Sequence, residues 1–347
     1  TKYLKPGEKN TLAVRLENLP ESSRWYPGAG LYRNVHLIIT EDAYIPVWGT
    51  YITTPSVNEK FAKVNVRTKV VLPEGADPAK YSVETSVWNP NKQKLTAVRT
   101  SLAQMKYNNN QAEQEFVIQT PSLWSPEMPA LYSAETRLYE GDKLKDIYTT
   151  PFGIRSIEII PDKGFFLNGK RTVFKGVCNH HDLGPLGAAV NDAAIRRQIR
   201  ILKDMGCNAI RTSHNMPAPE LIRACDEMGM MIMAESFDEW NVAKCKNGYN
   251  LLFDEWAEKD LVNLLHNFRN NPSVVMWCIG NEVPNQWNEG DCKIAKWLQD
   301  ICHREDPTRP VTCGMDQVSC VLANGFAAMI DLSLIHISEP TRQEAIS

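Results

Sequence analysis

In the second half of the chain, short apolar segments alternate regularly with segments of helical period, and this alternation limits the fold more than any other feature. Five apolar segments predict strands: "RTVFKGV", "NAIRTS", "MMIMAES", "SVVMWCIGNE" and "RPVTCG", at residues 171–177, 208–213, 230–236, 273–282 and 309–314. Four segments between them predict helices, at residues 191–206, 218–229, about 252–267 and 292–306. Such regular alternation predicts a parallel sheet, either closed into a barrel or doubly wound.

The segment 191–206 shows how the ends of these helices are encoded. Ile195, Ile199 and Leu202 recur at helical spacing. Asn191 precedes this pattern as a candidate N-cap, and Gly206 follows it where a helix commonly ends in a left-handed residue. We therefore predict a helix whose two ends are both defined.

Polar residues gather where the predicted strands end. They are His180, His181 and Asp182 after the first strand, Arg211 and His214 at the second, Glu235, Asp238 and Glu239 at the third, and Asn281 and Glu282 at the fourth. In a (β/α)8 barrel the C-terminal ends of the strands carry the active site. A nucleotide-binding sheet would need a glycine-rich turn after its first strand, whereas the GxG-like stretch at Gly28 leads into a strand. A barrel is therefore the better prediction.

The chain before Pro151 has the pattern of β-structure. Segments predicted as strands include "TLAVRLENL", "NVHLIIT", "FAKVNVRTKVVL", "YSVETSVWN" and "QEFVIQT", separated by turn-rich stretches. Strands at this spacing predict sandwich domains. The first forty residues are too few for a domain, so we expect them to be the last strands of one. The expected division is 1–41 for these strands, 42–150 for a second sandwich and 151–331 for a partial barrel.

Composition excludes several classes of protein. A net charge of −3 over 347 residues is not that of a nucleic-acid-binding surface, and no apolar run approaches the ~20 residues of a membrane span. The nine cysteines form no CxxC pair and are odd in number, which predicts buried single thiols rather than a disulfide framework or a zinc site. No HExxH motif follows the histidine pair, which argues against a zinc protease. The chain begins at Thr1, so the lack of a signal peptide says nothing about location.

Most of these polar residues also have a purely structural explanation. The two adjacent histidines could be loop residues, Arg211 could pair with a neighbouring acid, and Glu235 and Glu239 could begin a helix. Glu282 is harder to explain in this way, because a carboxylate after six apolar residues is costly unless it is paired, hydrogen-bonded or protonated. Together the residues indicate a site of carboxylates, imidazoles and one guanidinium. Without a phosphate loop or a cofactor motif, such a site favours acid–base hydrolysis.

The chain resembles glycoside hydrolase family 2, the family of β-galactosidases, β-glucuronidases and β-mannosidases. "RWYPGAGLYRNVHL" is similar to the closing strands of the family's sugar-binding jelly roll, and "PSLWSPEMPALY" and "FGIRSIEI" to the end of its immunoglobulin-like sandwich and the entry to its barrel. "FLNGKRTVFKGVCNHHD", "GCNAIRTSHNMP", "CDEMGMMIMAESFDEW" and "NNPSVVMWCIGNE" are similar to the first four barrel strands. The resemblance covers about residues 1–330. It implies the end of a jelly roll, an immunoglobulin-like β-sandwich and an incomplete (β/α)8 TIM barrel.

The resemblance also implies roles for the polar residues. The family uses a retaining mechanism with two carboxylates, and Glu282 matches the acid/base, which protonates the glycosidic oxygen and later deprotonates water. Asn281 matches the residue that hydrogen-bonds the sugar 2-hydroxyl. The other matched substrate-binding residues, near the sugar or in the stretch that lines the pocket, are His180, Arg211, His214, Asp238 and Glu239. Arg211 and its neighbours would then help to set how readily Glu282 holds a proton.

Two departures from the family pattern matter. Some β-galactosidases bind magnesium through a Glu, a nearby His and the acid/base Glu. Glu239 matches the first of these, but Asn241 stands in place of the His, which argues against a magnesium site, and no other cofactor is expected. The family's nucleophile is a Glu at the end of strand seven, whereas this chain runs out near strand six, around Met329. We therefore expect the chain by itself to be inactive.

The end of the chain continues no family pattern. "LSLIHISEPTR", at residues 332–342, has the sequence obtained by translating a common transposon-type sequencing adapter. We therefore expect residues 332–347 to be adapter read-through and not part of the fold.

The expected function is that of a retaining exo-β-glycosidase that acts on a β-linked oligosaccharide or glycoside. β-Galactosidase is favoured, because "GVCNHHDLG" and "AESFDEW" are most similar to that branch. β-Glucuronidase and β-mannosidase stay open as alternatives. A non-catalytic carbohydrate-binding sandwich protein is the rival class, and Glu282 at a strand end argues against it. No nucleic-acid or membrane partner is expected, and the sequence does not indicate an oligomeric state.

Overall fold

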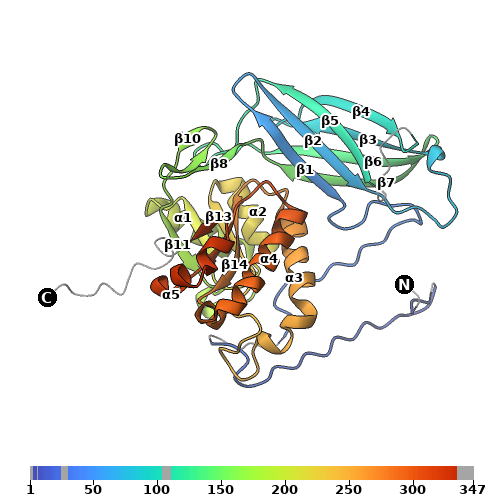
Figure 1. Ribbon diagram of the computed structural model, residues 1–347. Helices are drawn as coiled ribbons and strands as arrows, with labels where there is room; N and C mark the ends of the chain where they lie inside the picture. Colours follow the sequence, from blue (N-terminus) through green and yellow to red (C-terminus); the bar gives the residue numbers. More distant parts are fainter. Residues whose placement is uncertain (1–2, 6, 25–29, 104–110, 334–347) are drawn as a thin grey trace.

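The computed structural model describes residues 3–5, 7–24, 30–103 and 111–333. These residues form two main bodies, a β-sandwich and a parallel sheet flanked by helices (Figure 1). A small antiparallel sheet lies between them in sequence and consists of β8 (Ile157–Ile160), β9 (Gly164–Leu167) and β10 (Lys170–Arg171).

The sandwich consists of seven antiparallel strands in two sheets, with the orders β1-β2-β5 and β4-β3-β6-β7. The strands are β1 (Thr50–Val57), β2 (Phe61–Lys69), β3 (Tyr81–Trp88), β4 (Lys94–Ser101), β5 (Gln111–Gln119), β6 (Tyr132–Glu140) and β7 (Lys143–Phe152), with a short 3₁₀ helix, η1 (Pro78–Lys80), before β3. Along β5, buried and exposed side chains alternate strictly. This alternation is expected where one face of an antiparallel sheet covers the core and the other faces water.

Six strands form the parallel sheet, and each pairs with the next one along the chain. They are β11 (Gly176–Asn179), β12 (Ala209–Thr212), β13 (Met231–Glu235), β14 (Val274–Asn281), β15 (Val311–Gly314) and β16 (Leu332–Ser333). This sequential order is that of a TIM barrel and differs from that of a doubly wound sheet, in which the strand order reverses. All eight residues of β14 are buried, as expected for a strand covered on both faces.

Helices follow the first five strands of this sheet. The α-helices are α1 (Asp192–Asp204), α2 (Pro219–Met228), α3 (Phe253–Phe268), α4 (Cys292–Glu305) and α5 (Val318–Ala323). The short 3₁₀ helices are η2 (Gly184–Leu186), η3 (Tyr249–Leu251), η4 (Pro284–Trp287), η5 (Glu289–Asp291) and η6 (Phe326–Met329).

Helix α1 has the ends that the sequence predicts. The side chain of Asn191 caps its first turn by accepting a hydrogen bond of 3.0 Å from the backbone N–H of Ala194. Gly206 follows the helix with a φ of +87°, which a residue with a Cβ rarely adopts. Ile195, Ile199 and Leu202 face the core.

Three strand predictions are wrong. Residues 171–177 are not one strand: β10 ends at Arg171 and β11 begins at Gly176, which passes so close to β12 that an added Cβ would lie 2.6 Å from the carbonyl oxygen of Ala209. Residues 11–19 and 34–40 form no strand, although both are rich in apolar residues. A strand needs a neighbour that completes its hydrogen bonds, and no described strand lies beside either segment.

Two predicted features lie partly outside the described residues. They are residues 25–29 of the stretch similar to a jelly roll, and residues 334–347 of the expected adapter tail. The first two residues of that tail, Leu332 and Ser333, form β16 and pair with Thr312 and Cys313 of β15. The fold therefore includes these two residues.

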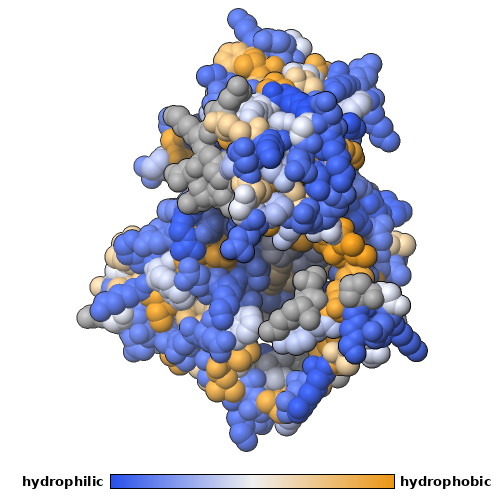
Figure 2. All heavy atoms as spheres, turned by 90° about the vertical axis from the view of Figure 1, so that its right-hand side faces the viewer, coloured by the Kyte–Doolittle hydropathy of each residue, from blue (hydrophilic) through white to orange (hydrophobic). Residues whose placement is uncertain are grey.

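The sandwich contacts the parallel sheet at the edge where its strands begin. Tyr51 in β1 donates a hydrogen bond of 2.7 Å from its hydroxyl to Asp306 Oδ1, which lies shortly before β15. Arg155, which follows β7, donates to the carbonyl oxygen of Val274, the first residue of β14. Figure 2 shows the two bodies as two lobes, with a hollow in the largely hydrophilic face below their junction.

All nine cysteines are free thiols. Four of them, Cys225, Cys278, Cys302 and Cys313, are buried, four are half-buried and Cys178 is exposed. The prediction of buried single thiols therefore holds for only part of the set. In the part of the chain that the structure describes, no helix combines the length and the apolar character that a membrane span needs.

Candidate active site

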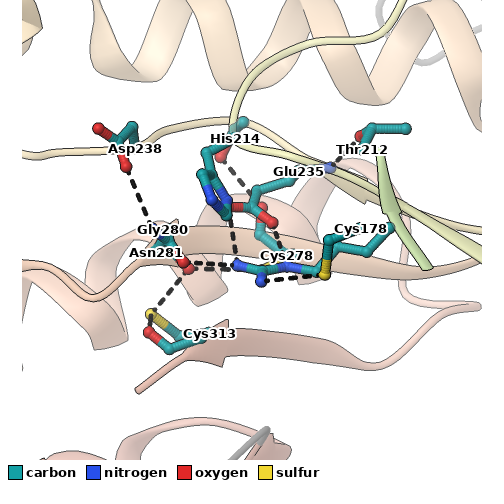
Figure 3. A network of polar contacts seen from close by, with 12 residues as sticks. Cys178, Thr212, His214, Glu235, Asp238, Cys278, Gly280, Asn281 and Cys313 are labelled. Carbon is teal, nitrogen blue, oxygen red and sulfur yellow. Dashed lines mark hydrogen bonds and ion pairs between the residues drawn. The ribbon is translucent and has the colours of Figure 1, made fainter. Parts of the chain in front are cut away.

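The C-terminal edge of the parallel sheet brings together polar side chains from three neighbouring strands. Arg211 lies in β12, Glu235 ends β13 and Asn281 ends β14. The backbones of adjacent strands are about 4.8 Å apart, so long side chains at their ends can meet. All three residues are buried, and Figure 3 shows Glu235 and Asn281 on the two sides of a guanidinium.

A buried ion pair is the centre of this site. Arg211 donates from Nε to Glu235 Oε2, and from Nη2 to Glu235 Oε1 over 3.0 Å. Glu235 is completely buried, and its backbone N–H donates to Thr212 Oγ1 over 3.0 Å. An isolated carboxylate at such a position would be strongly disfavoured. The two-point contact with a guanidinium is the geometry that makes its burial tolerable.

Two histidines extend this network. Nδ1 of His214 lies 2.8 Å from Glu235 Oε1. Because an ionised carboxylate can only accept hydrogen bonds, Nδ1 of His214 must carry the hydrogen. The ring of His180 stands edge-on to that of His214, with ring centroids 5.1 Å apart. Burial, together with the neighbouring imidazoles, lowers the pKa of His180 below its usual value, so His180 is neutral at pH 7.

The side-chain amide of Asn281 is held in one orientation. Its oxygen accepts a hydrogen bond of 3.0 Å from Arg211 Nη2, and its nitrogen donates over 3.1 Å to Asp238 Oδ1. A guanidinium can only donate and a carboxylate can only accept, so the alternative orientation of the amide would lose both bonds. The amide nitrogen carries a second hydrogen and the oxygen a second lone pair.

Asp238 is held by two cations that the sequence did not point to. Arg24 donates to it from Nε over 3.0 Å and from Nη2 over 2.7 Å, and Lys244 Nζ donates over 3.1 Å. Lys244 also donates to the backbone carbonyl oxygen of Asn281 over 2.5 Å. Burial raises the pKa of the Asp238 carboxyl, but the hydrogen bond from Arg24 and the charge of Lys244 outweigh it and hold that pKa below its usual range. Asp238 is therefore ionised at neutral pH.

Glu282 follows Asn281 directly and turns away from the strand. Its φ of +43° lies in the left-handed region, where a non-glycine residue is uncommon. Its backbone N–H donates to the carbonyl oxygen of Gly314 over 2.8 Å, which ties it to the end of β15. The side chain is half-buried, and no described residue donates a hydrogen bond to its carboxylate. Its charge acts on both Arg24 and Lys244. Strained residues of this kind cluster at functional sites.

Glu239 is buried. The resemblance implies that it lines the pocket, but its carboxylate is bound by backbone groups of the protein itself. Its carboxylate accepts hydrogen bonds from two backbone N–H groups, those of Lys244 over 2.5 Å and Asn250 over 3.0 Å. Gly248 packs so closely against it that an added Cβ would collide with the carboxylate. Glu239 therefore holds the loop that carries Lys244 in place, although it also borders the cavity described below.

The residues compared with a magnesium site do not fit one. Both carboxylate oxygens of Glu239 are occupied by N–H donors. Asn241 is exposed, and its side-chain oxygen accepts a hydrogen bond of 2.8 Å from Asn285. Within residues 3–333, apart from the undescribed gaps, no three His, Cys, Asp or Glu side chains are grouped as metal ligands would be.

A cavity of about 940 Å³ opens beside this network. His181, His214, Asp238 and Glu239 contribute to its wall from the barrel, and Arg24 from the N-terminal segment. Ligand sites in proteins commonly have volumes of roughly 300–1,000 Å³, so this cavity has the size of a ligand site, although Arg211, Asn281 and Glu282 are not among the residues that line it.

The sequence analysis names Glu235 among the polar residues at the strand ends but gives it no role, whereas the structure buries it at the centre of this network. The alternative that Glu235 and Glu239 begin a helix is wrong, because no helix starts there. The signal that could have given Glu235 a role in the site is its place at the end of the apolar segment "MMIMA", which parallels that of Glu282. No comparable signal marks Arg24 or Lys244, because both reach the site from irregular segments.

Two family models match the chain. "Glycosyl hydrolases family 2" matches residues 44–155, and "Glycosyl hydrolases family 2, TIM barrel domain" matches residues 158–337.

Relatives of known name are similar over most of the chain. The β-galactosidase BoGH2A of Bacteroides ovatus is 40% identical, over 91% of this chain and 41% of its own length. A β-glucuronidase of Bacteroides fragilis is 30% identical, over 91% of this chain and 47% of its own length. The crystal structure of a family 2 member from Bacteroides cellulosilyticus superposes with a TM-score of 0.83 at 35% identity, and covers 90% of this chain and 40% of that one.

The chain thus spans less than half the length of each of these relatives. The predicted architecture of a β-sandwich followed by a partial TIM barrel is confirmed by the strand order and by these matches. On the strength of both, this chain belongs to glycoside hydrolase family 2.

Proposed function

We propose that the complete protein is a retaining exo-β-glycosidase in which Glu282 is the general acid and base. The observation that carries this proposal is the position of Glu282 at the end of β14, beside a network of buried charges. Arg211, Asn281 and Asp238 form that network, and each is held by at least two hydrogen bonds. A catalytic group works best when its surroundings are already in place before the substrate arrives.

Glu282 has the freedom that an acid/base residue needs. Its carboxylate is half-buried and accepts no hydrogen bond from the described residues, so it can reach a glycosidic oxygen. In the first step it would give its proton to the leaving group, and in the second it would take a proton from water. After the first transfer, its carboxylate would lie within the electrostatic range of the cations Arg24 and Lys244.

Asn281 and Arg211 would position the sugar. The amide of Asn281 is oriented by Arg211 and Asp238, and its free hydrogen-bonding capacity suits a sugar hydroxyl, which both donates and accepts. The family resemblance assigns this contact to the 2-hydroxyl. Hydrogen bonds to that hydroxyl strengthen in the transition state of glycoside hydrolysis.

A retaining mechanism needs a second carboxylate as nucleophile, about 5–5.5 Å from the first. Glu235 is the other strand-end carboxylate near the site, but it cannot take this role. It is completely buried, and both of its oxygens are occupied by Arg211 and His214. We assign the nucleophile to none of the described residues, and the parallel sheet among them has six strands.

Among substrates, β-galactosides are favoured. The supporting observation is the 40% identity to the β-galactosidase BoGH2A, compared with 30% to the β-glucuronidase of Bacteroides fragilis. β-Glucuronides are the second candidate, because the β-glucuronidase of Bacteroides fragilis matches 91% of this chain, the same share as BoGH2A. β-Mannosides are the third, and they rest on the family resemblance alone.

The test is to express the complete gene product and to measure its turnover of 4-nitrophenyl β-galactoside, β-glucuronide and β-mannoside. The proposal expects the highest kcat/KM on the galactoside, and proton NMR of the first-formed product should show retention of the β-anomer. Binding of galactose without turnover of any glycoside would instead indicate a carbohydrate-binding protein. Highest turnover of the glucuronide would keep the enzyme class and overturn the substrate.

A further inference from the structure

A second cavity, of about 410 Å³, lies at the opposite edge of the parallel sheet. It lies between β1 of the sandwich and the segments that precede β14 and β15. Four arginines line it, Arg67, Arg155, Arg269 and Arg309, whereas none of its described lining residues is a carboxylate. Two of them, Arg155 and Arg309, are buried, and buried cations are normally paired with a carboxylate.

Among the four, Arg309 has the shortest contact with a carboxylate. Its Nη1 lies 2.6 Å from Asp306 Oδ2. The Asp306 carboxylate also accepts hydrogen bonds from the Tyr51 hydroxyl, the indole of Trp277, and the backbone N–H and hydroxyl of Thr308. Asp306 therefore has no capacity left to pair closely with another cation.

Arg155 is buried without an ion pair to any described residue. It is 9% exposed, and it donates from Nε to the carbonyl oxygen of Pro272 over 2.6 Å and from Nη2 to that of Val274 over 2.7 Å. Its Nη1 has no hydrogen-bond partner among the described residues. Burial and the neighbouring charge of Arg309 lower the pKa of Arg155 well below its usual value, although Asp306 and Asp226 act in the opposite direction.

Arg269 and Arg67 flank the ring of Tyr51. The guanidinium carbon of Arg269 lies 4.5 Å from the ring centroid, and that of Arg67 lies 5.3 Å from it. Nε of Arg269 is buried and has no hydrogen-bond partner, and its other nitrogens reach carbonyl oxygens only at 3.4 and 3.5 Å. Arg67 faces Glu113 at 3.7 Å, and both of these side chains are largely exposed.

The remaining carboxylates near this cavity are committed to other donors. Asp226 accepts hydrogen bonds from the backbone N–H of Ser273 and the side-chain amide of Asn271. Glu305 accepts from Arg304 and contacts His266 over 2.7 Å. Positive charge around the cavity thus exceeds the negative charge in direct contact with it.

We propose that this cavity binds a phosphate group, either as inorganic phosphate or as the end of a small phosphate monoester. Guanidiniums hold phosphate oxygens through pairs of N–H donors, and Arg155 and Arg269 both have donors to spare. A phosphate carries enough charge to balance more than one arginine. The volume of the cavity leaves room for a substituent beyond the phosphate itself.

The test is isothermal titration calorimetry of the complete protein at matched ionic strength in chloride buffer. The probes are inorganic phosphate, phenyl phosphate and citrate. Two variants probe the cavity: Arg155→Lys keeps the charge but loses the paired donors, and Arg67→Gln changes a more exposed side chain whose loss the fold tolerates better. Arg171→Gln is the matched control, because Arg171 is exposed in β10 and does not line the cavity.

The proposal expects saturable binding of a phosphate compound that either cavity variant weakens about 10-fold or more, the loss of one charge-assisted hydrogen bond. The control variant should leave the affinity unchanged. Comparable affinity for inorganic phosphate and phenyl phosphate would show that the phosphate group alone accounts for binding. Tighter binding of phenyl phosphate would show that the cavity prefers a phosphate monoester. No saturable phosphate binding, binding of citrate alone, or equal affinity in the cavity variants and the wild type would each overturn the proposal. Galactoside turnover is not part of the readout, so the result is independent of the proposed activity.

Discussion

The two edges of the parallel sheet both bury charge, but they neutralise it in different ways. At the C-terminal edge, Glu235 is bound directly by Arg211 and His214. At the N-terminal edge, Arg155 is bound by backbone carbonyls and Asp226 by amide donors, without an ion pair to either among the described residues. Both arrangements satisfy hydrogen bonds, but the charge of Glu235 is paired directly, whereas the charges of Arg155 and Asp226 are not.

The difference has a consequence for each edge. Direct pairing at the C-terminal edge fixes the orientation of Arg211 and Asn281 and leaves one carboxylate, Glu282, open for chemistry. Incomplete pairing at the N-terminal edge shifts the pKa of buried groups there: burial raises that of Asp226 to about 6, and burial with the charge of Arg309 lowers that of Arg155. The first edge suits catalysis, and the second suits the binding of a further charged group.

The largest expected effect is at Glu282. In the complete protein, Glu282→Gln should reduce kcat/KM by about 10²–10⁴-fold on galactosides with poor leaving groups, because general acid catalysis typically contributes that much. Activated aryl galactosides should lose far less, since their leaving group needs little protonation. Steady-state kinetics on both kinds of substrate measure the difference.

Glu258→Gln is the control for that experiment, because Glu258 is exposed on α3 and should not affect either rate. Equal losses on both kinds of substrate would remove Glu282 from the acid role.

The next largest effect is on the free energy of unfolding, and it should differ between variants of the two buried arginines, Arg211 and Arg155. Arg211→Leu leaves Glu235 buried without its guanidinium and should lower the free energy of unfolding by about 3–5 kcal/mol. Arg155→Met removes the donor to the Pro272 carbonyl, whereas the Val274 carbonyl still accepts from Arg309 Nε and no carboxylate is left unpaired, so it should cost about 1–3 kcal/mol. Urea denaturation followed by fluorescence gives both values. The double variant Arg211→Leu/Glu235→Leu should recover much of the stability that Arg211→Leu loses. If it does not, loss of the ion pair with Glu235 is not the cause of that destabilisation.

Asp226 should produce a smaller effect that depends on pH. Its pKa of about 6 in the folded protein exceeds the usual value of about 3.9 in an unfolded chain. The folded state therefore holds a proton that the unfolded state releases, and stability falls as the pH rises from about 4 to about 6. The free energy of unfolding of the wild type should fall by about 2 kcal/mol relative to that of Asp226→Asn over this range.

Urea denaturation at several pH values measures this difference, with Asp254→Asn on the exposed surface of α3 as the control. Parallel curves for the wild type and Asp226→Asn would show that Asp226 does not titrate in this range.

The smallest effect is expected at the junction of the two bodies. Tyr51→Phe removes the hydroxyl that donates to Asp306, but four other donors to that carboxylate remain. The cost should therefore be about 1 kcal/mol, that of one hydrogen bond, seen as a small fall in the thermal midpoint. Tyr44→Phe in the same sandwich should have no effect, and a loss as large as that of Arg211→Leu would mean that Tyr51 supports the whole junction.

The elements near the site could be predicted well because their signals are local. The ends of α1 follow from Asn191 and Gly206, and the end of β14 follows from the change of the apolar segment into Asn281 and Glu282. Residues 11–19 could not be predicted in this way, because an apolar segment becomes a strand only where a neighbour completes its hydrogen bonds.

The sequence by itself determined the alternation and order of strands and helices from α1 to β15, and the presence of polar residues at the strand ends. Periodicity and capping depend on residues within a few positions of one another, so they can be seen without the fold. The partners of those polar residues were decided by the tertiary structure alone. Arg24 contacts Asp238 although 214 positions separate them, and Arg155 contacts Val274 of β14 across 119 positions. Such contacts depend on how two bodies pack, because charge and hydrogen bonding act over a few ångströms in space, whatever the separation along the chain.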